Sequence, residues 1–559
     1  MASLNGDILH LVALEIYGGS WGSDRIPTLA NFAAVSRDVR TAVLPLLFRK
    51  VSWPHRRKVD DLQGLHFFPE ALWPHFSMTS ALTPLPCSRH FVFDWPHEWL
   101  DRFPPKYGDY GSDPYSRNYY APRHLEPLLN ALPTLQLTHV TLRCPFVPPI
   151  ALVSALLKCP TLHTLSCEDT PLDCPLPTQA FPALTTLALV AVGEGLRIGD
   201  GKVDPRIADR FLWVRAWKNR YRARRELRLP MEAWTAMLLL ARHASRLRTM
   251  QLSGDLCDPG RLAACHWPEL HTFILTGHVP GPPYDSAPLS VALARMPRVR
   301  DVRLLLAKSP DKRLLNVLPP ESSADMLPST LTHFAVSTAC ALDRGLLARG
   351  PGLSSVAIVS IMDFPRLPIA LSLAEAANLI TDLSSGASPR QLRIMIEDKL
   401  APDFCAYLST RLPLLEELEI EVCGYHDGKP AYEWHEFAQA LAPLTHLRSL
   451  RICIQFPEFD DVGVGAPWWD VRAACAAVLV EQLPTLHRVG LEYRERTGTH
   501  KYQDSWLEFD VVRKASAPAA GAVLVDGSKE VVDKVVLEPQ PTRCYEFPEV
   551  WETCTGAYE

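Results

Sequence analysis

Three cysteine and histidine residues near position 430 have side chains that could bind a metal. Cys423, His426 and His435 supply a thiol and two imidazoles, but their spacing fits no recognised zinc site and a fourth ligand is missing. The His-Glu pairs at 97–98 and 435–436 do not continue into H-E-x-x-H, the helical motif of zinc proteases. We therefore expect no metal site, and these histidines are typical of surface loops.

Glycine-rich and nucleophile motifs are also incomplete. Gly193, Gly195 and Gly199 follow an apolar run, but they miss the dinucleotide-binding spacing G-x-G-x-x-G by one residue. No phosphate-binding lysine-serine pair follows them, and the nucleophile motif G-x-S-x-G does not occur. The sequence therefore predicts a protein that is not an enzyme and has no cofactor.

Charged residues that alternate with apolar residues along the chain indicate a binding surface and not a catalytic site. In LPLLEELEIEVC (412–423), three glutamates at positions 417, 419 and 421 would share one face of a strand. The leucine and isoleucine between them would share the other face. This stretch is therefore expected to be a short strand with one face exposed to solvent.

Arginines occupy the matching position in the two flanking strands. Because adjacent strands lie about 4.8 Å apart, Arg393, Glu419 and Arg451 are expected to form a cross-strand charge ladder. One interpretation is mutual neutralisation on an exposed sheet, which contributes little to stability. The other is a charged patch that binds a protein substrate through Arg393, Glu417, Glu419 and Arg451. Middle strands carry fewer charges at this position, although Arg303 is an exception.

The strand at 415–420 is one of about twelve copies of the pattern L-x-x-L-x-L. A proline or similar breaker precedes most copies by two residues, and a helix-like run precedes many breakers. The repeated unit is therefore helix, breaker and short strand, the pattern of leucine-rich repeats, and it predicts a curved α/β solenoid. The first positions of the copies are Leu137, Leu162, Leu184, Leu247, Leu270, Val299, Leu331, Leu353, Pro389, Leu415, Leu447 and Leu486.

The first fifty residues predict short amphipathic helices. Ile8, Val12 and Ile16 are spaced four residues apart on one helical face, and a second apolar stripe follows in residues 26–51. This stretch resembles a divergent F-box, the adaptor-binding module of SCF-type (Skp–cullin–F-box) ubiquitin ligases. Leu4, Asp7, Ile8, Leu9 and Val12 match or nearly match the usual opening, Leu29, Phe32, Val35 and Ser36-Arg37 match the later helix, and LPLLFRKV (44–51) matches the exit.

The order of an F-box and then repeats is similar to that of fungal F-box–leucine-rich-repeat proteins. The resemblance implies a substrate-receptor subunit that binds a Skp-family adaptor, through it a cullin, and a protein substrate through the repeats. It places the adaptor contacts on Leu4, Ile8, Leu9, Val12, Val35 and Leu46. The alternative is a leucine-rich-repeat interaction scaffold whose N-terminal helices only cap the first repeat against residues 137–142.

Overall composition limits the partners and the compartment. The net charge is −5, which argues against general nucleic-acid coating, and no apolar run approaches the length of a membrane span. The fourteen cysteines are scattered without framework spacing, and the N-terminus lacks a signal-peptide pattern. We therefore expect a cytoplasmic or nuclear protein without a membrane partner.

The expected organisation has four parts. Residues 1–53 form the F-box-like module, 54–124 an aromatic and proline-rich connector, 125–495 the solenoid, and 496–559 a C-terminal cap and tail. A basic insertion within 192–228 has ten basic and three acidic residues between 201 and 228. Its aromatic residues could pack on the solenoid, or its charges could serve nuclear import or bind acidic or phosphorylated partners.

Overall fold

The computed structural model describes most of the repeat region and shorter parts of both ends. The described residues are 9, 11–13, 28, 31–32, 34–36, 39, 42–43, 50–54, 89–94, 129–130, 132–143, 147–168, 170–172, 180–191, 196–198, 229–280, 287–307, 314–319, 327–342, 345–363, 370–422, 432–454, 456, 467–498, 501–514, 534–539 and 543–544.

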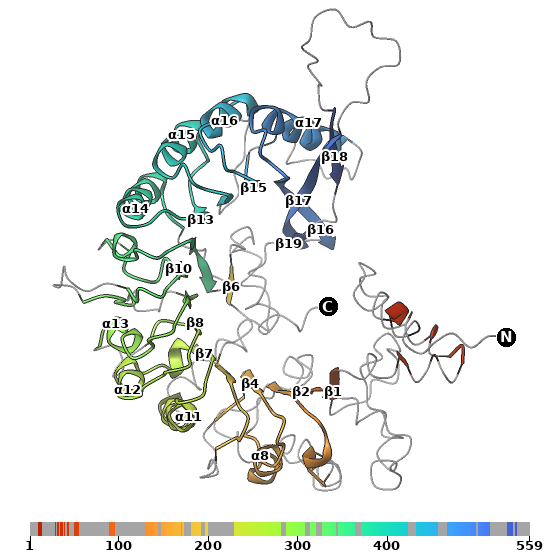
Figure 1. The fold of residues 1–559 in the computed structure, drawn as a ribbon, viewed down its shortest axis with the longest axis vertical. Helices are drawn as coiled ribbons and strands as arrows, with labels where there is room; N and C mark the ends of the chain where they lie inside the picture. The colour runs from red at the N-terminus through yellow and green to blue at the C-terminus, as the bar shows by residue number, and fades with distance from the viewer. Residues whose placement is uncertain are drawn as a thin grey trace, which may run out of the picture.

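A single curved sheet runs through the molecule, and in the part of the chain that is described it contains seventeen strands (Figure 1). Fourteen of them are parallel neighbours in chain order: β1 (Lys50–Pro54), β2 (His90–Asp94), β3 (His139–Arg143), β4 (Thr164–Glu168), β5 (Thr186–Val190), β7 (Thr249–Ser253), β8 (Thr272–Thr276), β9 (Asp301–Leu304), β10 (His333–Ser337), β11 (Ser355–Val359), β13 (Gln391–Ile396), β14 (Glu417–Val422), β15 (Ser449–Ile452) and β16 (Arg488–Gly498).

The C-terminal end of this sheet is antiparallel. β17 (Lys501–Lys514) pairs with β16, and both β18 (Lys534–Pro539) and β19 (Arg543–Cys544) pair with β17. β17 therefore covers the edge of β16, the last repeat strand. A separate two-stranded sheet joins β6 (Leu196–Ile198) to β12 (Ile361–Asp363).

Helices cover the outer, convex face of the sheet (Figure 1). Some of them begin at a residue whose side chain caps the helix. Asp258 accepts a hydrogen bond from the Arg261 backbone N–H before one helix, and Ser372 with Glu375 forms a capping box before another. The helices are α8 (Ile150–Leu157), α11 (Leu229–His243), α12 (Pro259–Ala264), α13 (Leu289–Leu293), α14 (Leu373–Gly386), α15 (Pro402–Arg411), α16 (Trp434–Leu441) and α17 (Pro467–Gln482), with short 3-10 helices η4 (Leu132–Thr134), η5 (Gly254–Leu256) and η6 (Leu347–Arg349).

The repeat leucines align in the sheet and form its core. In each parallel pair the second apolar position of one repeat faces the second of the next, as Leu392, Leu418 and Leu450 do. The third positions align in the same way, and both rows are buried in one continuous cluster with the helices. The twelve predicted repeats correspond to β3–β5, β7–β11 and β13–β16, so the expected α/β solenoid is confirmed.

The parallel sheet begins before the predicted boundary at residue 125. β2 pairs with β3, and β1 pairs with β2, so strands lie within the predicted 54–124 connector and at the end of the predicted F-box-like module. Phe91 and Phe93 of β2 are buried in the repeat core. The leucine pattern missed this strand because Ser88 occupies its first position, where the other repeats have an apolar residue or proline.

A second, smaller core lies in the N-terminal region. Leu9, Ala13, Val39 and Val43 are buried together, and Phe32 packs against them. This cluster is separate from the repeat core. The four buried residues of this cluster therefore pack on one another and do not belong to the cluster that contains Leu137, Val140 and Leu142.

Candidate protein-binding site on the concave face

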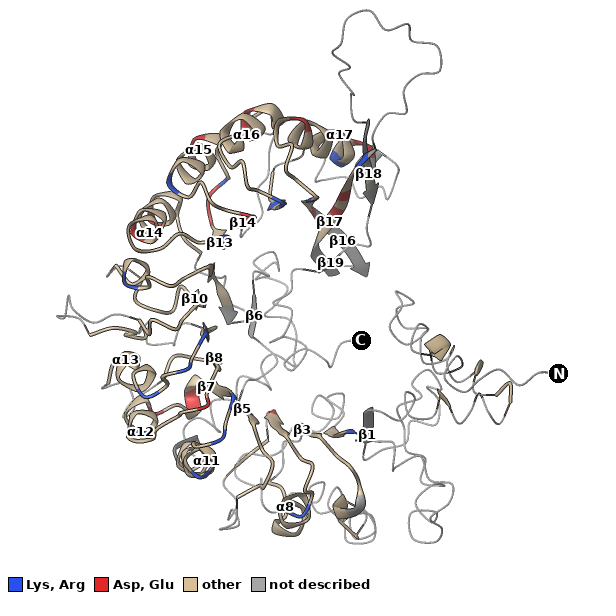
Figure 2. Ribbon diagram, viewed as in Figure 1, with Lys and Arg blue, Asp and Glu red and all other residues tan. Residues whose placement is uncertain are grey.

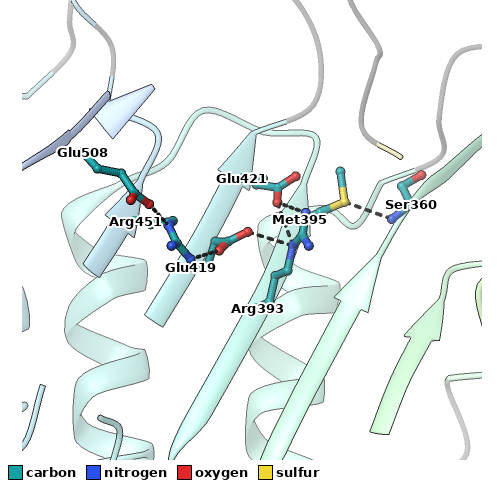
Figure 3. A network of polar contacts seen from close by, with 7 residues as sticks. All are labelled: Ser360, Arg393, Met395, Glu419, Glu421, Arg451 and Glu508. Carbon is teal, nitrogen blue, oxygen red and sulfur yellow. Dashed lines mark hydrogen bonds and ion pairs between the residues drawn. The ribbon is translucent and has the colours of Figure 1, made fainter. Parts of the chain in front are cut away.

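Three predicted charged residues meet on the concave face. Arg393, Glu419 and Arg451 are aligned in β13, β14 and β15. The Arg393 Nε lies 2.9 Å from Glu419 Oε1, and the Arg451 Nη1 lies 2.9 Å from Glu419 Oε2 (Figure 3). Each residue alternates with buried repeat leucines or isoleucines, which is why its side chain lies on the face opposite the helices. The predicted charge ladder is present.

The ladder continues into the C-terminal strands. The Arg451 Nε donates a hydrogen bond to Glu508 Oε1 of β17 at 2.7 Å. Gly490 of β16 is aligned with both residues and lies between them. A Cβ atom on Gly490 would come 2.9 Å from the Arg451 Cγ, so the glycine leaves room for Arg451 to cross β16.

Glu421 ends the ladder on its other side. Arg393 donates to Glu421 Oε1 through Nε, at 2.7 Å, and through Nη2. The Glu421 side chain is 1% exposed, and its Oε2 atom has no hydrogen-bond partner among the described residues. Burial raises the pKa of Glu421 to about 8, with Arg393 lowering it and neighbouring Glu419 raising it. Met395, its register partner in β13, accepts a hydrogen bond at Sδ from the Ser360 backbone N–H (Figure 3).

The pKa of Glu419 is shifted in the opposite direction to that of Glu421, although Glu419 is also largely buried. Burial alone would raise its pKa, but the positive charges of Arg393 and Arg451 and hydrogen bonds to its carboxylate hold the pKa below the ordinary value. The two arginines therefore keep Glu419 ionised, while Glu421 retains its proton more readily. The charges neutralise one another, as in the first of the two interpretations drawn from the sequence, but the side chains of Arg393, Glu419 and Arg451 are only 12–19% exposed, so the sheet is not exposed there.

Glu417 is not part of this network. It is exposed at the first position of β14, where Gln391 and Ser449 are its neighbours in register. Sequence reasoning missed Glu508 as a member of the network. The signal for it was the alternation in SWLEFDVV, in which Trp506, Glu508 and Asp510 share one face of β17.

The proposed adaptor contacts fall into three groups. Val12 and Val35 are exposed, at 43% and 71%, and the neighbouring Leu11 is 64% exposed. Leu9 is 5% exposed and belongs to the small N-terminal core, so its side chain supports the module from inside. The remaining three lie outside the described residues: Leu4, Ile8 and Leu46.

Most of the other residues singled out in the sequence lie outside the described residues. His435 is exposed at the start of α16, whereas Cys423 and His426 lie outside the described residues, as do Gly193, Gly195, Gly199 and the whole of 201–228. Within the described ranges, no group of three or more histidine, cysteine or acidic residues could hold a metal ion. None of the helices described there is long and apolar enough to cross a membrane.

The repeat region has a leucine-rich-repeat-like fold. No family model and no curated protein matches this chain. Among solved structures it is similar to the TLR13 chain of a complex with ssRNA13, at 11% sequence identity and a TM-score of 0.27. The match covers 66% of this chain and spans 55% of the TLR13 chain. This likeness carries no argument about function, and the fold rests on the strand register described above.

Proposed function

We propose that this protein is the substrate-receptor subunit of an SCF-type ubiquitin ligase. In this role the N-terminal module binds a Skp-family adaptor and through it a cullin, while the repeats hold a protein substrate. Such a subunit performs no chemistry of its own and raises the local concentration of substrate beside the ubiquitin-charged enzyme. The role would place the protein in the cytoplasm or the nucleus.

The observation that carries the proposal is the exposed apolar surface of a module with its own core. Leu9, Ala13, Val39 and Val43 pack inside, and nearby apolar side chains face solvent. A helical cap on the first repeat would use its apolar face against that repeat. The separate small core therefore supports a partner-binding module, and exposed apolar residues are typical of contact surfaces.

A pull-down of the full chain with purified Skp-family adaptor tests the proposal. The variant Val12→Asp, Val35→Asp places two charges on the proposed contact surface and should abolish capture. The control variant Val291→Asp, Leu414→Asp changes two residues of similar exposure on the repeats, 46% and 50%, and should bind normally. Absence of binding by the folded wild-type chain would instead favour a leucine-rich-repeat scaffold with no ubiquitin-ligase role.

A further inference from the structure

Two arginine side chains and one histidine side chain lie next to one another at the N-terminal ends of neighbouring strands. Arg248, His271 and Arg300 each immediately precede β7, β8 and β9. The His271 backbone N–H donates to the Arg248 carbonyl at 2.8 Å, and the Arg300 N–H donates to the His271 carbonyl at 2.9 Å. Since adjacent strands lie about 4.8 Å apart, the three side chains leave the backbone in a row.

Further arginines surround this row. Five arginines and one acidic residue, Glu269, lie in the three segments 244–248, 265–271 and 294–300. All five arginines are exposed, and Glu269 pairs with Arg298 at 2.7 Å. We call the surface formed by Arg246, Arg248, His271, Arg295, Arg298 and Arg300 the arginine rim. Figure 2 shows blue segments, which are lysine or arginine, near helices α11–α13 and the adjoining strands.

The same position in the C-terminal repeats is neutralised. There Arg390, Glu416 and Arg448 are linked by backbone hydrogen bonds of 2.7 Å, in the same manner as the row above. Glu416 lies 3.0 Å from Arg390 and 4.0 Å from Arg448, so an acidic residue separates the two arginines. In the arginine rim His271 takes the place of that glutamate, so no acidic residue stands between Arg248 and Arg300 in the row.

A purely structural role accounts for part of the arginine rim. Arginines near helix C-termini stabilise the helix dipole, and Arg246 also donates to the Pro182 carbonyl at 2.6 Å. Arg248 and Arg300 lie at strand starts instead, and the structure gives them no ion pair with another described residue. These two arginines lie two strands apart, on either side of His271, and each is exposed to solvent.

We propose that the arginine rim binds an acidic segment of a protein partner. Arginine guanidinium groups bind carboxylates with two parallel hydrogen bonds, and a row of them suits several carboxylates in succession. A protein is favoured over nucleic acid because the chain as a whole carries a charge of −5, and nucleic-acid binding needs a wider basic surface. The inference goes beyond the ubiquitin-ligase role and holds equally for a repeat scaffold.

Fluorescence anisotropy with a labelled ten-residue oligoglutamate peptide and the full chain tests this proposal at low ionic strength. The variant Arg248→Ala, Arg300→Ala should weaken binding at least fivefold. The control Arg390→Ala, Arg448→Ala removes the same number of charges from the neutralised position and should change affinity less than twofold. Binding of the wild type should also weaken as salt is added, because the contacts are between exposed charges.

Three results would overturn the proposal. The first is no binding of the peptide by the wild-type chain. The second is an equal loss of affinity in the control variant, which would mean that the location of the arginines does not matter. The third is tighter binding of a ten-residue oligouridine through Arg248 and Arg300, which would make this a nucleic-acid surface. Circular dichroism and adaptor capture should be unchanged in both variants, so a failure here is separate from a failure of the adaptor proposal.

Discussion

Arg451 and Glu508 form an ion pair of 2.7 Å across an intervening strand, although 57 residues separate them in the sequence. The contact joins the parallel repeats to the antiparallel C-terminal strands. It exists because the residue between them is Gly490, whose missing side chain lets the arginine pass.

Substitution of Gly490 by alanine should destabilise the protein by about 1–3 kcal/mol, the usual cost of overpacking. The added Cβ would lie 2.9 Å from the Arg451 Cγ. Urea unfolding of the two single variants and of the double variant Gly490→Ala, Arg451→Ala measures the coupling free energy between the two positions. The glycine substitution should cost less once the Arg451 side chain is removed. Equal costs in both backgrounds would show that Gly490 is not required for this crossing.

Substitution of Arg451 by methionine should lower the free energy of unfolding by about 3–5 kcal/mol, since it removes the partner of the buried Glu508 and one of the two arginine partners of Glu419. Glu419 and Glu508 both accept hydrogen bonds from this guanidinium. Arg390→Met provides the comparison, because Arg390 is 69% exposed and its pair with Glu416 is screened by water. Chemical denaturation should separate the two variants clearly, and similar losses would contradict the buried network.

The stability of the protein should fall as the pH rises toward 8 because of Glu421. Its pKa is about 8 in the folded chain, against an ordinary value of 4.5, so the folded state binds more protons between these values. The stabilisation is therefore complete below pH 4.5 and is lost as the pH passes through 8. Glu419, with its lowered pKa, loses its contribution only as the pH falls below 4.5.

The variant Glu421→Gln isolates this effect, because glutamine cannot ionise. We expect urea midpoints at pH 6 and pH 9 to differ less in the variant than in the wild type. A wild-type pH dependence that survives the substitution unchanged would assign the titration to other groups.

Replacement of Phe93 by alanine should cost about 3–5 kcal/mol, the usual range for a buried phenylalanine. Phe93 is 0% exposed in β2, and Phe273, also 0% exposed in β8, is the reference position within the leucine pattern. Comparable losses in urea unfolding would confirm that the solenoid includes β2. A loss below about 1 kcal/mol for Phe93 alone would show that the cooperative core begins later.

The repeats could be predicted from the sequence because leucine spacing determines both the buried face and the register. Once the leucine positions of three strands align, the alignment of Arg393, Glu419 and Arg451 follows directly. The contribution of Glu508 could not be obtained in this way. It depends on an antiparallel pairing and on a side chain crossing Gly490, neither of which a repeat pattern encodes.

The N-terminal helix shows a different difficulty. The spacing of Ile8, Val12 and Ile16 suggested one apolar face, whereas the described core uses Leu9 and Ala13 and leaves Val12 exposed. Of the adaptor contacts predicted on this helix and described in the structure, Leu9 therefore lies inside the module and Val12 on its surface. In a short helix that is apolar on several sides, the choice of face is made by tertiary packing and cannot be read from period alone.

The length of the parallel sheet, with its fourteen strands, sets how much of it a linear peptide can follow. At about 4.8 Å per strand their contour is roughly 60 Å, and an extended chain advances about 3.3 Å per residue. A linear peptide would need roughly eighteen residues to follow the sheet from end to end. A short acidic tail can therefore engage the arginine rim while leaving most of the curve open for the folded body to which the tail is attached.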